Sequence, residues 1–198
     1  KVLSVRASAL TGLGAEAAPQ ATAAERNLVA FGDSVLADPD AGSYFAHRYD
    51  RSKGVGVDCP TSNNYAKRAG AKLRLPVRDF SCSGAVSMSP GPQIFQQVDA
   101  ALRTGALTPA TNRVVITTGF NDTYNHRDLN LPQIRKQFVD HTAPQIERIK
   151  RAAPNARIQI VGYPTIGSGP YYCLFPFGPR PADATVRPAF RDWEREAR

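Results

Sequence analysis

Ser34 is the first residue whose type and position suggest chemistry. It follows Phe31-Gly32-Asp33, at the end of a short apolar run over residues 27–31. Such a run predicts a buried strand. The serine then lies at the carboxyl edge of a sheet, where open α/β folds build their sites. A serine hydroxyl at that edge can attack an acyl carbonyl, so Ser34 is a candidate nucleophile.

Two further polar sites follow predicted strands. Gly84 comes after a strand over residues 77–80, and Asn121 comes after a strand over residues 113–118. The oxyanion that forms during acyl transfer needs preorganised hydrogen-bond donors. The backbone N–H groups of Ser34 and Gly84 and the side-chain amide of Asn121 are three such donors. Glycine at position 84 also lets the backbone approach a substrate closely. The sequence therefore predicts an oxyanion hole beside the candidate nucleophile.

The elements that must position these residues alternate between strands and helices. Strands are expected at 27–31, 77–80, 113–118 and 158–161, and no hairpin signal separates them. This order predicts an α/β fold with a central parallel sheet, a three-layer α/β/α sandwich. The helices between them are expected at 43–49, 64–73, 92–105, from 132 with a kink at Pro144, and from 188. Their expected buried faces are Tyr65, Ala69 and Leu73 in the second, and Ile94, Phe95, Val98, Ala101 and Leu102 in the third.

The composition fits one domain of ordinary globular type. The 198 residues are 42% hydrophobic and carry a formal net charge of +8. The basic residues are scattered at helical spacing, which indicates solvated helix faces, and no basic run with interleaved aromatic residues suggests a nucleic-acid groove. No run of 18 apolar residues predicts a membrane span. Residues 1–26 read as a leader or poorly ordered segment, and residues 27–198 as the folded domain.

The sequence has three cysteines. Cys59 and Cys82 lie in loops that flank one predicted helix and one predicted strand, so a disulfide between them is plausible, with two buried free thiols as the alternative. A bridge would stabilise the fold by about 3–4 kcal/mol on the loop-entropy model. It would also fit a secreted or cell-envelope protein. Cys173 is then left without a partner.

The strand-end motifs together resemble the GDSL/SGNH hydrolase family, in particular its secreted actinobacterial members. The resemblance covers residues 27–165, and Gly162-Tyr163-Pro164 is similar to the end of the family's fourth strand. It implies the SGNH-hydrolase, flavodoxin-like fold and hydrolysis of carboxylic esters through an acyl-enzyme on Ser34. It implies no metal and no organic cofactor, and a small-molecule or lipid ester as substrate. The three matching blocks are Phe31-Gly32-Asp33-Ser34, Ser81-Cys82-Ser83-Gly84-Ala85 and Gly119-Phe120-Asn121-Asp122.

The sequence departs from the family at the fourth block, Asp-x-x-His, which supplies the catalytic base. None of the three histidines, His47, His126 and His141, has aspartate three residues before it. Together with the unpaired Cys173 and a last helix that no strand follows, this predicts that the C-terminal part is missing. The alternatives are His126 as a substitute base, or an inactive truncated or split remnant that acts as a binding module. A C-terminal fragment is then a possible complementing partner.

A loop over residues 165–181 is rich in aromatic side chains. Because it follows a strand at the active edge, it is a candidate lining for an acyl or leaving-group pocket. The alternative is a loop that packs its own aromatic residues. The side chains concerned are Tyr171, Tyr172, Phe175 and Phe177.

Overall fold

The protein is an α/β fold built on a parallel sheet. The structure is a computed structural model and describes residues 24–49, 58–88, 93–126, 128–164, 167–168 and 171–172. Four strands pair in the order β2-β1-β3-β4, all parallel. The strands are β1 (Leu28–Gly32), β2 (Val77–Asp79), β3 (Arg113–Thr117) and β4 (Arg157–Ile160). The helices are α1 (Ser34–Ala37), α2 (Ala41–Tyr49), α3 (Tyr65–Leu73), α4 (Ile94–Arg103), α5 (Phe120–Asn125) and α6 (Leu131–Ala152).

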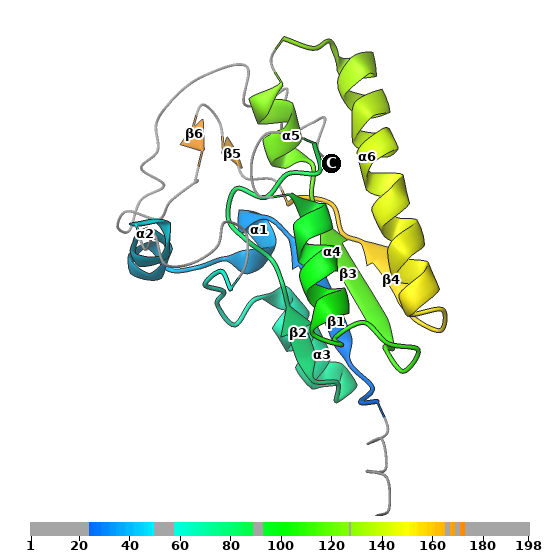
Figure 1. Ribbon diagram of the computed structural model, residues 1–198. Coiled ribbons are helices and arrows are strands. Elements are labelled where there is room, and N and C mark those ends of the chain that lie inside the picture. The colour runs from blue at the N-terminus through cyan, green and yellow to red at the C-terminus, as the bar shows by residue number, and fades with distance from the viewer. Residues whose placement is uncertain are drawn as a thin grey trace, which may run out of the picture.

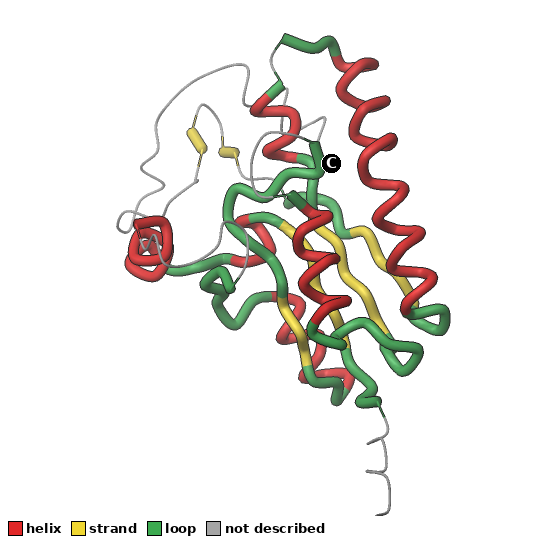
Figure 2. Tube along the Cα trace, viewed as in Figure 1, coloured by secondary structure: helices red, strands yellow, loops and turns green. Residues whose placement is uncertain are grey.

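Both faces of the sheet are covered by helices, as the layers in Figures 1 and 2 show. Successive side chains of a strand point to opposite faces. Val29 and Phe31 accordingly belong to the core cluster that includes residues of α4 and α6. Leu28 and Ala30 belong to a second cluster, with residues of α1 and α3. The predicted three-layer sandwich with a parallel sheet is therefore confirmed.

The carboxyl ends of β2, β1 and β3 lie side by side. Gly32 is in register with Thr117 of β3, and the Cys82 N–H donates to the Gly32 carbonyl oxygen at 2.9 Å. The chain leaves each strand at this level, so α1 and α5 sit at the same end of the sheet (Figure 1). This arrangement brings the loops after all three strands to one edge.

Two predicted helix faces were partly wrong. In α3 the buried positions are Ala66 and Gly70, whereas Leu73 is 49% exposed. In α4 Phe95 is 41% exposed, and the polar Gln97 is buried in its place. Which side chains of a helix face the sheet depends on the strands and backbone groups that they contact in the folded protein. The hydrophobic pattern along one helix does not contain that information.

Four short elements were not predicted. The helices α1 and α5 span four and six residues, too few to give a helical period. The strands β5 (Gly167–Ser168) and β6 (Tyr171–Tyr172) pair antiparallel, so the expectation of no hairpin was wrong. Two-residue strands leave no alternating pattern to read.

Three other predictions concern the helix around Pro144, the N-terminal leader and the helix from Pro188. The helix α6 runs without interruption through Pro144. Residues 24–26 of the predicted leader are exposed and form neither helix nor strand. The helix predicted from Pro188 lies outside the described residues. None of the helices in the described part is long and apolar enough to cross a bilayer.

Candidate active site

Ser34 is the first residue of α1 and is exposed at the carboxyl end of β1. The preceding Asp33 caps this helix, because its Oδ1 atom accepts a hydrogen bond from the Val35 N–H at 2.9 Å. An aspartate at the N-cap fixes the direction in which the first turn leaves the strand. The hydroxyl of Ser34 is thus held at the end of a buried strand and open to solvent.

Gly84 lies in the exposed turn that follows β2. Its φ angle is +83°, a conformation that residues with a side chain rarely adopt. A Cβ placed on Gly84 would have no atom within 4 Å, so the glycine leaves open space above the backbone. The predicted disulfide between Cys59 and Cys82 is present and anchors this turn. The turn therefore presents bare backbone beside the end of β1.

Asn121 lies in the first turn of α5, directly after β3, and its side chain is half-buried. Its Nδ2 atom donates to the carbonyl oxygen of Ala85 at 3.0 Å, which links it to the residue after Gly84. An amide nitrogen carries two hydrogens, so a second N–H remains for a ligand. The structure thus brings the Asn121 and Gly84 segments into direct contact.

Asp122 fixes the same two segments more firmly. Its buried carboxylate accepts hydrogen bonds from the N–H groups of Ser87, at 3.0 Å, and Met88, at 2.6 Å. Burial raises the pKa of Asp122, although these backbone bonds and the nearby His126 act in the opposite direction. The carboxylate therefore serves to hold the loop after Gly84 against α5.

A second buried carboxylate links β1 to β4. The Oδ2 atom of Asp33 accepts a hydrogen bond from the hydroxyl of Tyr163, which follows β4. The same hydroxyl accepts from the N–H of Phe120 at 3.2 Å. Burial raises the pKa of Asp33 to about 7, and burial, with the nearby Asp33 carboxylate, raises the pKa of Tyr163. Sequence reasoning noted the Gly-Tyr-Pro segment but gave Tyr163 no role.

Gln97 holds the strand end from the α4 side. Its buried amide makes two hydrogen bonds to Gly32, accepting from the N–H and donating to the carbonyl oxygen, both at 2.8 Å. The Gln97 side chain thus pairs with the last residue of β1 as a neighbouring backbone would. The sequence signal for this role was the position of Gln97, a polar residue on the otherwise apolar face of α4.

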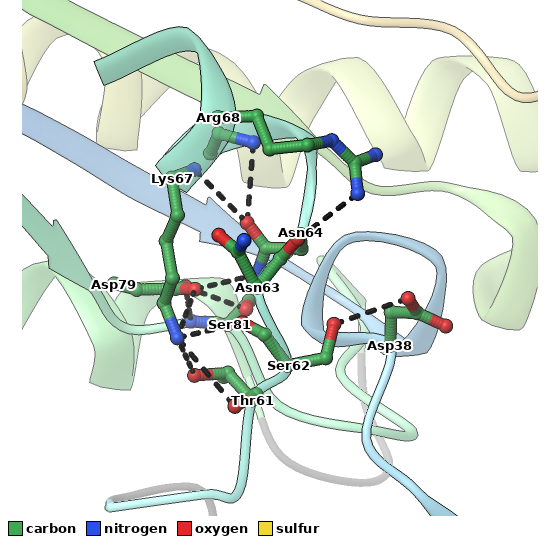
Figure 3. A network of polar contacts seen from close by, with 10 residues as sticks. Asp38, Thr61, Ser62, Asn63, Asn64, Lys67, Arg68, Asp79 and Ser81 are labelled. Atoms are coloured by element: carbon green, nitrogen blue, oxygen red, sulfur yellow. Dashed lines mark hydrogen bonds and ion pairs between the residues drawn. The ribbon is translucent and has the colours of Figure 1, made fainter. Parts of the chain in front are cut away.

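A polar network supports the opposite flank of the site (Figure 3). Asp79 accepts from Asn64 at 2.7 Å and from the hydroxyl of Ser81 at 2.6 Å, so it joins the start of α3 to the end of β2. Ser62 donates to Asp38, the C-cap of α1, at 3.1 Å. These contacts attach the segment that carries Ser34 to the loop bridged by Cys59.

The three histidines belong to three different elements of the described structure. His47 is in α2, and His141 is exposed on α6. His126 caps the C-terminus of α5, close to Asp122, and its Nε2 atom is buried without a hydrogen-bond partner. Within the described ranges, no hydrogen bond joins a histidine to Ser34.

The aromatic loop predicted over residues 165–181 lies only partly within the described residues. The backbones of Tyr171 and Tyr172 form β6, while their side chains and all of Phe175, Phe177 and Cys173 lie outside the described residues. No cluster of three potential metal ligands occurs in the part of the chain that the structure describes.

The parallel sheet with helices on both faces is an α/β fold of the SGNH-hydrolase type. A family model for the GDSL-like lipase/acylhydrolase family matches residues 30–198, and the chain belongs to this family. The resemblance read from the sequence is thereby confirmed. A comparison with curated protein sequences gave no match.

Solved structures with the same fold include secreted and carbohydrate-active hydrolases. An extracellular lipase from Streptomyces rimosus is similar at 21% identity and a TM-score of 0.50, over 87% of this chain and 72% of the lipase. A family two carbohydrate esterase from Clostridium thermocellum is similar at 19% identity and a TM-score of 0.51, over 73% of this chain and 44% of the esterase. Likenesses at these identities support the fold.

Proposed function

We propose that the chain is a serine-dependent carboxylic-ester hydrolase in which Ser34 is the nucleophile. The observation that carries this proposal is the meeting of three strand-end loops at one edge of the sheet. One presents Ser34, the second Gly84 and the third Asn121. Family membership supports the same chemistry. The catalytic unit proposed is the single domain over residues 27–198.

The proposed reaction begins with attack of the Ser34 hydroxyl oxygen on the ester carbonyl carbon. The hydroxyl proton passes to a base, and negative charge develops on the carbonyl oxygen. The N–H groups of Ser34 and Gly84 and the amide of Asn121 would stabilise that charge, the kind of contribution that is worth about 3–4 kcal/mol per donor. Loss of the alcohol leaves an acyl-enzyme, which water hydrolyses.

The base is the unassigned part of this mechanism. None of the three histidines stands in an Asp-x-x-His sequence. This observation favours a second candidate function, in which the chain keeps the fold and binds ligands without turnover, alone or with a complementing fragment. The position of His126 beside Asp122 makes it the histidine to test as a substitute base.

The proposed substrate class is an ester of a small molecule or lipid. The relatives named above are described as a lipase and a carbohydrate esterase, and they set the range of esters to assay. We also propose a secreted or cell-envelope location, which the Cys59–Cys82 disulfide supports because such bonds persist in oxidising compartments.

The test compares hydrolysis of p-nitrophenyl acetate and butyrate by the wild-type chain, Ser34→Ala and Ser43→Ala. Ser43 is an exposed serine in α2, so its variant controls for loss of a surface hydroxyl. We expect Ser34→Ala to lose at least about a hundredfold in rate, and Ser43→Ala to match the wild type. Turnover that survives Ser34→Ala would refute Ser34 as nucleophile. Absence of turnover in all three proteins would favour the binding function.

A further inference from the structure

Tyr163 stands outside the three motifs that carry the proposed chemistry. It follows β4, the last strand of the sheet in the described residues, and its side chain is 7% exposed. A buried tyrosine hydroxyl needs hydrogen-bond partners, and the partners found here are informative. One is the carboxylate of Asp33, the residue before Ser34, and the other is the N–H of Phe120, the residue before Asn121.

We infer that Tyr163 is a positioning residue that holds the nucleophile turn and the asparagine turn at a fixed separation for ester hydrolysis. The inference deepens the proposed function and rests on it. The hydroxyl donates to one turn and accepts from the other, so a single oxygen atom spans the gap between β1 and β3 beyond their last paired residues. The ring of Tyr163 also lies 5.9 Å from that of Phe120, centroid to centroid.

The connection continues to the third loop. Asn121 donates from Nδ2 to Ala85, next to Gly84. A continuous path of covalent and hydrogen bonds therefore joins Ser34, Asn121 and Gly84, and Tyr163 joins it from the segment after β4. An oxyanion hole works only when its donors are fixed within a fraction of an ångström. Asp33, Tyr163 and Ala85 provide the hydrogen-bonded links of this path.

The Asn121 turn and the Ser34 turn differ in how many other hydrogen bonds hold them in place. The Asn121 loop is also held by Asp122, through the backbone of Ser87 and Met88. The Asp33 carboxylate has two hydrogen-bond donors, Val35 within its own turn and Tyr163 from outside it. Removal of the Tyr163 hydroxyl should therefore loosen the Ser34 side of the site more than the Gly84 side.

The test compares Tyr163→Phe with Tyr65→Phe as a matched control. Tyr65 is a partly buried tyrosine near the end of β3, and its hydroxyl bonds to Thr117 rather than to either turn. Tyr163→Phe loses two internal hydrogen bonds and Tyr65→Phe loses one, so the two variants should lose about 2 and about 1 kcal/mol of stability, respectively. We expect Tyr163→Phe to lower kcat about 10- to 100-fold with KM nearly unchanged, and Tyr65→Phe to change kcat less than about twofold.

Amide chemical shifts from NMR provide a readout that does not depend on turnover. For Tyr163→Phe we expect shifts at both Ser34 and Asn121 that exceed those produced by Tyr65→Phe. Shifts confined to the surroundings of position 163 would overturn the inference, as would equal losses of kcat in the two variants. A wild-type chain without Ser34-dependent hydrolysis would refute the proposed function and leave the NMR comparison to decide the positioning role.

A double-mutant cycle tests the same contact a second time, and Asp33→Asn alone serves where Tyr163→Phe folds poorly. Asp33→Asn perturbs the same hydrogen bond from the other side. If the two residues act as one unit, the amide shifts at Ser34 and Asn121 in Asp33→Asn should resemble those of Tyr163→Phe, and the double variant should lose little more kcat than either single variant. Additive losses, or unshifted Ser34 and Asn121 amides in Asp33→Asn, would overturn the inference.

Discussion

Replacement of Asp33 by asparagine should change how the stability of the protein depends on pH. The Asp33 carboxyl is 1% exposed, and burial raises its pKa from 3.8 to about 7. Between these values the native carboxyl keeps a proton that the unfolded chain has lost, so unfolding releases a proton. Rising pH then favours the unfolded state, and the stability falls from about pH 4 until it levels off above about pH 7.

The size of this effect follows from the pKa shift. Because the pKa of Asp33 rises from 3.8 to about 7, and each pH unit in that range is worth about 1.4 kcal/mol, the wild-type free energy of unfolding should fall by about 4 kcal/mol across the range. Asparagine has nearly the same shape and can still accept from Val35, but it has no charge to bury. The Asp33→Asn variant should therefore lack this part of the pH dependence.

The titration of neighbouring groups does not remove the difference in pH-dependent stability between the wild type and Asp33→Asn. Burial also raises the pKa of Asp122, which adds a decrease of the same sign to both proteins. The pKa values of Tyr65 and Tyr163 are raised above 10, so these groups titrate outside the range. The difference between wild type and variant thus reports chiefly on Asp33.

The assay is urea unfolding followed by far-UV circular dichroism at several pH values from 4 to 8.5. We expect the variant to gain about 4 kcal/mol relative to the wild type between the two ends of the range. Asp40→Asn is the control, because Asp40 is exposed and its hydrogen bonds with Ser43 lower its pKa, so its contribution has the opposite sign. Parallel pH curves for wild type and Asp33→Asn would refute the buried, weakly acidic state of Asp33.

Two further predictions concern the supports of the site. Replacement of both Cys59 and Cys82 by alanine opens a 23-residue crosslink and should lower the free energy of unfolding by about 3–4 kcal/mol, measurable by urea titration against the wild type with and without reductant. If the reduced wild type matches the oxidised one, the bridge does not form in solution. Gln97→Leu leaves the N–H of Gly32 without its partner and should cost about 2 kcal/mol. An unchanged melting temperature for that variant would show that the bond is dispensable.

The sheet and its main helices were predictable because their signals are local. The β-branched run before Gly119 and the apolar run before Gly32 each lie within a few residues, and both form buried strands. The placement of Ser34 and Asn121 at strand ends followed from these two runs, and that of Gly84 from the short strand over residues 77–80. Parallel strands then bring those ends to one edge by geometry alone.

The supports of the site could not be predicted because their partners are distant in the chain. Tyr163 and Asp33 are 130 residues apart, and Gln97 and Gly32 are 65 apart. Gln97 is buried because its amide bonds to the N–H and carbonyl groups of Gly32 at the end of β1. These two backbone groups come within its reach only when the sheet has formed. Hydrophobic periodicity instead favoured Phe95 in that helix, and Phe95 is 41% exposed.

The three residues of the Gly-Asp-Ser motif have separate physical tasks. A Cβ on Gly32 would lie 2.7 Å from the Thr117 carbonyl oxygen and 2.9 Å from the Leu36 Cδ2 atom, so β1 can meet β3 and α1 this closely only with glycine. Asp33 caps α1 and accepts the Tyr163 hydroxyl, which fixes the turn from within and from outside. Ser34 is the one member with an exposed side chain. Substitution of Gly32 or Asp33 should therefore act on the position of the Ser34 hydroxyl, whereas substitution of Ser34 removes the group that reacts.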